Sequence, residues 1–224
     1  MLKILAIDTS SDTCSAAVLN GEKIFTRFVA AKLQHNKLIL PMLHELLIEA
    51  NLLIQQLDVI AFGCGPGSFT GVRIAASIVQ GLAYATNLPV VKISTLRALA
   101  QGAFVEFGKT HCLVAQDARM QEIYWGQYQL DPTAIMQPVV PDQLLAPQKV
   151  QLLSSNGYTG VGNGWKIYDD ILTKSCKIEV IDTVIYPQAK YIGQLAGVDF
   201  TKGLTVSAQE ALPVYLREEV AWIK

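Results

Sequence analysis

Residues 1–30 read MLKILAIDTS SDTCSAAVLN GEKIFTRFVA, and their pattern sets the fold class. β-Branched and other apolar residues predict three strands, at residues 2–8, 13–19 and 22–29. Asn20-Gly21 separates the second strand from the third, and this dipeptide between apolar runs is the strongest short-range signal for a hairpin. We therefore expect the chain to begin as an antiparallel meander.

Two helices and a buried strand are expected after the meander. Apolar residues recur at three- and four-residue spacing over residues 36–50, which predicts a helix that Pro41 should start or kink. Residues 57–63 form a continuous apolar run that predicts a buried strand. Residues 70–85 alternate small with apolar residues, as in a closely packed helix. A short strand at 88–93 and a helix from Leu96, capped by Ser94 and Thr95, complete this half.

The second half repeats the order of the first. A new meander is expected at residues 112–116 and 122–130, followed by strands near 160–162 and 177–181 and helices at 165–173 and 188–198. Proline and glutamine crowd residues 132–151, which predicts surface loop and short helix. We expect an α/β fold of two similar lobes, an N-terminal lobe of residues 1–103 and a C-terminal lobe of residues 104–224.

Composition excludes several classes of protein. Hydrophobic residues make up 51% of the 224 and charged residues 17%, which excludes a disordered chain and favours some apolar surface for a partner. The 18 basic and 19 acidic residues leave a net charge of -1, so the basic surface of a protein that holds nucleic acid alone is missing.

The compartment is expected to be the cytoplasm. The first residues reach a charge at Lys3, too soon for a signal peptide, and no apolar run is long enough to span a membrane. The cysteines form no C-x-x-C pair, so we interpret all of them as buried thiols: Cys14, Cys64, Cys112 and Cys176.

Two short polar segments are candidates for a degenerate nucleotide site. Asp8, Thr9 and Ser10 follow the opening strand, where backbone N–H groups and hydroxyls bind phosphates and a carboxylate holds metal-bound water. Asp117 and Arg119 precede a strand and point to the same side of an extended chain. The alternative is structural. Asp8, Thr9 and Ser10 would form a turn whose side chains hydrogen-bond to their own backbone, and Asp117 and Arg119 would simply pair with each other. Gly162-Asn163-Gly164 is likewise compatible with an adenosine site and with a tight turn.

The block GCGPGSFTGVR at residues 63–73 joins the buried strand to the small-residue helix. It is not a P-loop, because no Gly-Lys-Ser/Thr ends it, and Thr70 replaces the third glycine of G-x-G-x-x-G. The helix N-terminus at residues 68–70 is suited to an anion. The competing interpretation is close helix packing, which Gly71, Ala75, Ala76 and Gly81 favour.

The sequence offers no metal or nucleophile motif. His35, His44 and His111 include no pair at the i, i+4 spacing of two metal ligands on one helix. No serine or cysteine lies in an elbow motif beside a histidine. We expect neither a catalytic metal nor catalytic residues.

Four segments resemble the TsaB (YeaZ) family in content and order: LAIDTS at 5–10, GPGSFTGVR at 65–73, DAR at 117–119 and PVYLR at 213–217. The glycine block is the most specific of them. The resemblance implies the actin-like ATPase (ribonuclease H-like) fold, in which each of two similar lobes is a mixed sheet flanked by helices. It agrees with the repeated meander-then-helix pattern.

The resemblance also implies a function. Family members partner TsaD, a paralogue whose histidine pair holds the catalytic metal and which moves a threonylcarbamoyl group from its adenylate onto adenosine 37 of tRNAs reading codons that begin with A. This sequence lacks such a pair, which indicates a non-catalytic scaffold and activator. The ATPase TsaE joins the complex, tRNA is met only through it, and no membrane is involved. No cofactor is expected, and weak nucleotide binding would fall at the complex interface.

In the family the N-terminal lobe helices form the interface, as a homodimer alone and as a heterodimer with TsaD. The interface residues expected here are His35, Leu38, Met42, Phe69, Thr70, Gly71, Arg73, Ile74, Ala75 and Ile78. Two other functions compete with the scaffold. A small-molecule kinase or ATPase of the same fold would use Asp8 and the Asp117 region around Mg-ATP, and a metalloprotease would need the missing ligand pair.

Overall fold

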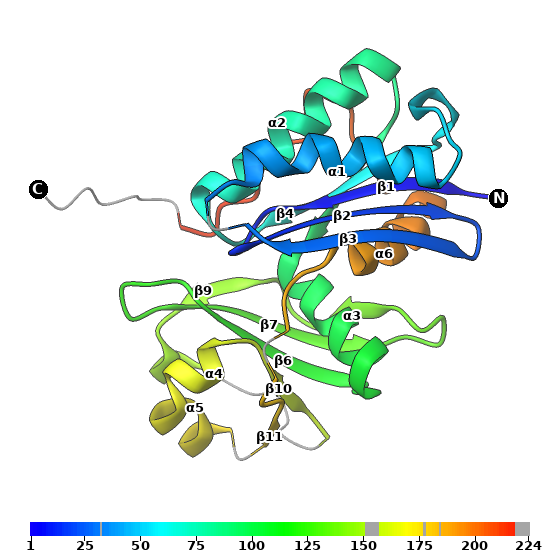
Figure 1. Ribbon diagram of the computed structural model, residues 1–224. Helices are drawn as coiled ribbons and strands as arrows, with labels where there is room; N and C mark the ends of the chain where they lie inside the picture. Colours follow the sequence, from blue (N-terminus) through cyan, green and yellow to red (C-terminus); the bar gives the residue numbers. More distant parts are fainter. Residues whose placement is uncertain (32, 151–156, 177, 184, 218–224) are drawn as a thin grey trace, which may run out of the picture.

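The computed structural model describes residues 1–31, 33–150, 157–176, 178–183 and 185–217 and contains two β-sheets, one above the other in Figure 1. The first sheet has the strand order β3-β2-β1-β4-β5. β1 to β3 form the antiparallel meander, and β4 and β5 run parallel to β1. Its strands are β1 (Lys3–Asp8), β2 (Thr13–Asn20), β3 (Lys23–Ala30), β4 (Val59–Gly65) and β5 (Val90–Ser94).

The second sheet repeats this arrangement. Its order is β11-β10-β6-β7-β8, with β6 and β7 antiparallel and with β10 and β11 parallel to β6. The short β9 pairs with the other end of β7. These strands are β6 (His111–Asp117), β7 (Ile123–Leu130), β8 (Met136–Pro138), β9 (Gln143–Leu145), β10 (Thr159–Val161) and β11 (Glu179–Val180). The duplicated topology confirms the actin-like, ribonuclease H-like fold class.

Helices cover both faces of each sheet (Figure 1). On the first sheet, α1 (His35–Glu49) and α2 (Phe69–Thr86) cover the outer face, and α6 (Ala189–Thr201) covers the inner face. On the second sheet, α3 (Thr95–Phe107) covers the inner face, while α4 (Gly164–Ile167) and α5 (Asp169–Ser175) cover the outer face. α3 and α6 contact each other between the sheets. Two 3-10 turns, η1 (Ile54–Gln56) and η2 (Pro147–Lys149), complete the elements.

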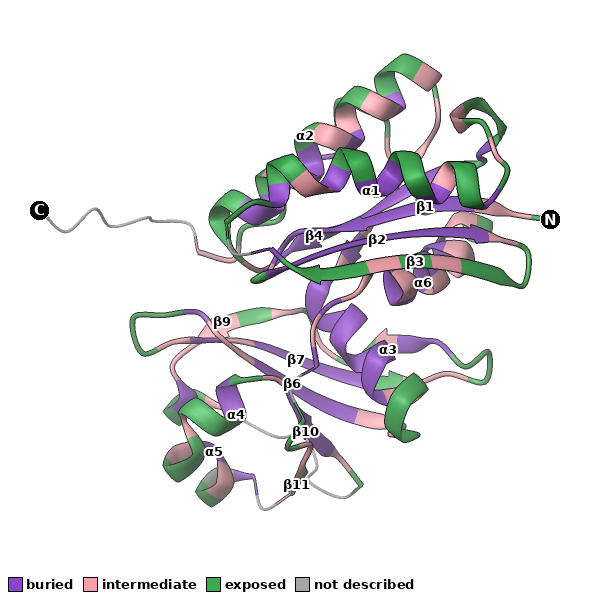
Figure 2. Cartoon of the chain, viewed as in Figure 1, coloured by how far each residue is buried: buried purple, intermediate pink, exposed green. Residues whose placement is uncertain are grey.

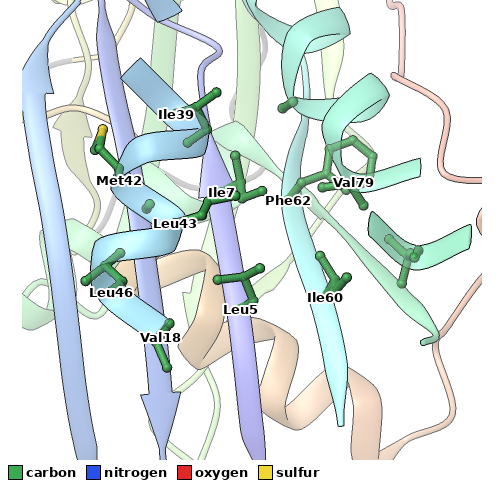
Figure 3. Close-up of a cluster of buried hydrophobic side chains, with 14 of the residues drawn as sticks. Leu5, Ile7, Val18, Ile39, Met42, Leu43, Leu46, Ile60, Phe62 and Val79 are labelled. Atoms are coloured by element: carbon green, nitrogen blue, oxygen red, sulfur yellow. The ribbon is translucent and has the colours of Figure 1, made fainter. Parts of the chain in front are cut away.

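The alternation of side chains along β1 explains why its sheet needs helices on both sides. Leu5 and Ile7 face the core beneath α1 and α2, where they meet Ile39 and Phe62 (Figure 3). Ile4 and Ala6 face the opposite core, beneath α6. Successive residues of a strand point to opposite faces, so a strand that is apolar throughout is covered on both. Figure 2 shows the resulting burial of the central strands.

Three expectations about local structure were wrong in whole or in part. The helix expected at 165–173 is two helices, because Tyr168 leaves the helical conformation between α4 and α5. Residues 132–150, the described part of 132–151, contain the short helix η2 but also the strands β8 and β9, and Ile135 and Met136 there are buried. α1 begins at His35 and contains Pro41, so Pro41 does not start the helix, and the alternative of a kink stays a prediction.

From α6 onward the chain returns to the first sheet. α6 packs on β1, β2, β4 and β5. Val206 then exchanges backbone hydrogen bonds with Val90 at 3.0 and 2.8 Å, and the Val214 N–H donates to the Cys64 carbonyl at 2.8 Å. The division after residue 103 falls within α3 and stays a prediction.

The four cysteines are free and buried, as expected. Among the described residues, no helix combines the length and apolar character needed to cross a membrane.

Candidate functional site: an interlobe cleft and the α1–α2 face

A cleft of about 480 Å³ between the lobes brings together all the motifs found in the sequence. The turn after β1 and the glycine block line one side, and residues 116–120 and Asn163 line the other. α3 supplies the floor through Thr95 and Leu99. Three aromatic rings, Phe69, Tyr124 and Tyr186, and two guanidinium groups, Arg119 and Arg217, complete a lining suited to a ligand with a flat ring and an anion.

Asp8 is sealed beneath the cleft and does not line it. The Ser10 N–H and the Ser10 hydroxyl both donate to its carboxylate, at 3.1 and 3.0 Å. The other side of the carboxylate lies against Gly63, where an added Cβ would overlap Oδ2. Burial raises the pKa of Asp8 to about 7, although the hydrogen bonds from Ser10 oppose that rise. A fully buried carboxylate enclosed in this way does not reach a ligand in the cleft.

The glycine block leaves room for the turn after β1, which packs directly against it. An added Cβ at Gly71 would overlap the Thr9 carbonyl oxygen, and one at Gly67 would lie 2.6 Å from the Ser10 carbonyl oxygen. The Thr9 hydroxyl donates to the Gly71 carbonyl at 2.7 Å, and the Ser68 side chain caps α2 by accepting from the Gly71 N–H. Close packing is therefore the role of Gly67 and Gly71, and their near neighbour is the turn after β1 rather than another helix.

The Asp117 carboxylate organises the opposite wall. It accepts hydrogen bonds from the Arg119 N–H at 3.0 Å and the Tyr168 hydroxyl at 3.1 Å, and it pairs with the Arg119 guanidinium at 3.2 Å. The Asp117 N–H donates to Asn163 Oδ1 at 2.9 Å, which joins the Asp117–Arg119 segment to the Gly162-Asn163-Gly164 turn. The Arg119 side chain is 87% exposed, so a ligand in the cleft can reach its guanidinium group.

The turn between β6 and β7 has an unusual backbone. Arg119, Met120 and Gln121 have φ values of 62°, 55° and 60°, three consecutive non-glycine residues in the left-handed region. Each such residue costs about 1 kcal/mol or more, and such residues gather at functional sites. No glycine marks this turn, so no residue pattern predicts its backbone conformation.

A second hollow, of about 470 Å³, lies between α1 and α2 on the outer face of the molecule. Leu40 and Phe69 are about half exposed there, at 52% and 49%. Of the expected interface residues, five line this hollow: Phe69, Thr70, Arg73, Ile74 and Ile78. Sequence reasoning missed its other lining residues, Asn36, Leu40 and Ser77, although Leu40 is an apolar residue on the outer face of an amphipathic helix.

The remaining expected interface residues face inward. His35 and Met42 are buried, and His35 Nε2 lies 2.9 Å from the Ser11 carbonyl oxygen. Ala75 is fully buried in the outer core, and Leu38 packs against the same core. Their side chains pack in the core beneath α1 and α2 and do not line the hollow.

The chain is similar to characterised proteins over its full length. It is 39% identical to the "tRNA threonylcarbamoyladenosine biosynthesis protein TsaB" of Escherichia coli, over all of this chain and 98% of that protein. It is also 39% identical to the TsaB protein of Haemophilus influenzae, over all of this chain and 97% of that protein. The solved structure of YeaZ from Pseudomonas aeruginosa superposes with a TM-score of 0.90 at 39% identity, covering 96% of this chain and 100% of that one.

A family model described as "TsaD: tRNA N6-adenosine threonylcarbamoyltransferase" matches residues 29–224. The chain belongs to the TsaB branch of the TsaD family. The four segments that resemble TsaB meet in space: residues 5–10 and 65–73 pack on each other, residues 117–119 face them across the cleft, and residues 213–217 run beside both.

The described part of this TsaB chain contains no group of three or more His, Cys, Asp or Glu side chains arranged to hold a metal ion. Arg217 and Tyr186 are cleft residues that sequence reasoning did not select. Arg217 lies in the closing segment that carried the family resemblance, and that was the available signal.

Proposed function

We propose that this chain is a non-catalytic scaffold and activator subunit for threonylcarbamoylation of adenosine 37 in tRNAs reading codons that begin with A. It acts through a complex with TsaD and the ATPase TsaE. The names of its full-length relatives support the pathway. The observation that carries the scaffold role is the exposed apolar hollow between α1 and α2, because a buried apolar anchor is what a protein interface needs at its centre.

The sealed position of Asp8 supports a non-catalytic role. A kinase or ATPase of this fold would need a carboxylate at the metal-binding position, and both oxygens of Asp8 accept from Ser10 beneath the cleft. Of the two acidic residues that line the cleft, Asp117 is engaged by Arg119, Tyr168 and its own turn, while Asp12 is exposed. The contacts of Asp117 position the backbone of its wall.

The same α1–α2 face serves self-association and TsaD binding in this proposal. Phe69, Ile74 and Ile78 supply the apolar part of the hollow, and Arg73 supplies a charge at its edge. A second copy of the chain and TsaD then compete for one surface, so TsaD replaces the second copy and the homodimer is converted to the heterodimer. tRNA is met through the complex in this proposal, and the net charge of -1 supports it, because proteins that hold nucleic acid alone are usually strongly basic. The compartment we propose is the cytoplasm.

We assign no resident cofactor to this chain. Weak nucleotide binding, if measured, would use Ser10, Asp117 and Arg119 in the cleft or form at the complex interface. Asp8 and Thr9 would contribute through the turn that they hold in place.

The test compares two leucine variants. Leu40→Glu places a charge in the hollow, and Leu204→Glu places the same charge at a leucine of similar exposure, 59%, just after α6. Light scattering after size exclusion is measured on each chain alone and mixed with the TsaD paralogue of the same organism, followed by a tRNA modification assay. We expect a shift from homodimer to heterodimer for the wild type and Leu204→Glu. Leu40→Glu should lose both the complex and the modification.

Two results would overturn the proposal. One is a complex that forms equally well with Leu40→Glu. The other is a wild-type chain that forms no complex and turns over ATP by itself, which would favour the small-molecule kinase or ATPase.

A further inference from the structure

The closing segment, residues 213–217, runs along the glycine block and forms a backbone hydrogen bond to the first lobe. The Val214 N–H donates to the Cys64 carbonyl at 2.8 Å. The Val214 carbonyl oxygen lies so close to Gly65 that an added Cβ there would be 2.7 Å away. Gly65 has a φ of 114°, a conformation that glycine alone adopts readily. Glycine at this position therefore admits the closing segment.

At the first lobe, the segment contacts two residues that line the α1–α2 hollow. The Tyr215 hydroxyl accepts a hydrogen bond from Arg73 Nε at 2.7 Å. The Arg73 guanidinium lies 3.7 Å above the centre of the Phe69 ring, and the Phe69 and Tyr215 rings are 5.8 Å apart. Phe69 and Arg73 line the hollow, but Tyr215 does not. Tyr215 thus fixes two residues of the proposed interface from outside it.

At the second lobe, the segment is attached by Arg217. Its Nη2 donates to Glu122 Oε2 at 2.6 Å and to the Ala118 carbonyl at 3.1 Å, and its Nη1 lies 3.4 Å from Met120 Sδ. These contacts hold both ends of the left-handed turn at 119–121. One five-residue segment therefore joins the α1–α2 hollow to the far wall of the cleft.

We infer that residues 213–217 act as a strap that organises the partner surface, with Tyr215 as a positioning residue and Arg217 as its anchor on the second lobe. The inference rests on the proposed function. A long arginine side chain loses conformational freedom when a partner binds it, and holding Arg73 on the Phe69 ring beforehand reduces that loss. Release of the strap should therefore weaken partner binding without unfolding the chain, because Tyr215 is exposed, at 45%, and Arg217 is half-buried.

Tyr215→Phe tests the first contact, because it keeps the ring and removes only the hydroxyl that Arg73 uses. The matched control is Tyr84→Phe on α2, whose tyrosine is 77% exposed. The affinity of each purified chain for the TsaD paralogue is measured by calorimetry, and stability is measured by urea unfolding. We expect Tyr215→Phe to weaken binding about three- to tenfold. Its unfolding midpoint, and both properties of Tyr84→Phe, should equal those of the wild type.

Glu122→Ala tests the anchor from the opposite lobe. The control is Glu179→Ala, which removes a carboxylate paired with Lys109 at 2.7 Å, about as short as the Glu122–Arg217 contact. We expect Glu122→Ala to weaken binding about two- to fivefold and Glu179→Ala to have no effect. If both contacts act through one strap, Tyr215→Phe and Glu122→Ala together should weaken binding by less than the product of their separate effects.

The outcomes separate the two proposals. If the wild-type chain does not bind the TsaD paralogue, the proposed function and the role of the strap are both overturned. If the wild type binds and Tyr215→Phe binds equally well, the strap alone is overturned. Independent effects of Tyr215→Phe and Glu122→Ala would also contradict a single strap.

Discussion

Replacing Asp8 by asparagine should stabilise the fold, and the gain should grow as the pH rises. Asp8 is fully buried, and burial raises its pKa from its ordinary value near 3.8 to about 7. Between these values the folded chain keeps a proton that the unfolded chain has released. The folded state then binds more protons than the unfolded state, so the Asp8 contribution to stability falls as the pH rises and levels off at about pH 8, above the folded pKa.

The size of the effect follows from the shift. One pKa unit corresponds to about 1.4 kcal/mol, so the full rise is worth about 4 kcal/mol, and about 3 kcal/mol of it develops between about pH 5 and about pH 8. Asparagine has no charge to bury, its Oδ1 accepts from the Ser10 N–H, and its amide donates to the Ser10 hydroxyl oxygen. The free energy by which Asp8→Asn exceeds the wild type should therefore widen by about 3 kcal/mol over this range.

Urea unfolding of both chains at the two pH values measures the difference. Comparing variants at the same pH cancels the titration of every other group. Asp12→Asn, which removes an exposed carboxylate from the same turn, is the control for a general effect of charge. A difference between Asp8→Asn and the wild type that stays the same at both pH values would refute the assignment of a proton to folded Asp8.

Two further changes test the packing of the fold. Gly71→Ala should destabilise the chain by about 3 kcal/mol, because the new Cβ overlaps the Thr9 carbonyl oxygen, a backbone atom that has no room to yield. Gly81→Ala on the same helix has open space around its Cβ and should stabilise it by about 1 kcal/mol, so equal unfolding free energies for the two variants would contradict the packing. Arg97→Met should cost about 3–5 kcal/mol in urea unfolding, because it leaves the buried Asp199 carboxylate, paired at 2.6 Å, without its partner. Adding Asp199→Leu should recover most of that loss, and a double variant as unstable as Arg97→Met would show that the lost charge pairing is not the cause.

Local patterns in the sequence predicted most of the first lobe. The Asn20-Gly21 signal and the apolar runs beside it predicted the meander, but the pairing of Asn20 with Lys23 places the two-residue turn one position later, at Gly21 and Glu22. The three- and four-residue spacing predicted α1 to within a residue, and the alternation of small and apolar residues did the same for α2. These signals were sufficient because the contacts that form hairpins and amphipathic helices lie close together in the sequence.

Other features depend on residues far apart in the chain. Helical spacing shows which side of α1 is apolar, but it does not show that Leu40 stays half exposed while Met42 is buried in the outer core. Asp8 is sealed by the turn of Ser10 and by Gly63, which no pattern around Asp8 indicates. The sequence likewise did not show that α6 would cover the first sheet, since an amphipathic helix of the second half fits either lobe.

The return of α6 to the first sheet affects how the protein folds during its synthesis on the ribosome. All five strands of that sheet have left the ribosome once Ser94 has emerged, but the inner face stays bare until Thr201 follows. Ile4, Leu19 and Val59 on that face must wait for a helix translated long after them. The nascent first lobe thus presents an uncovered apolar sheet while the second lobe is still being synthesised, and the two lobes complete their cores together.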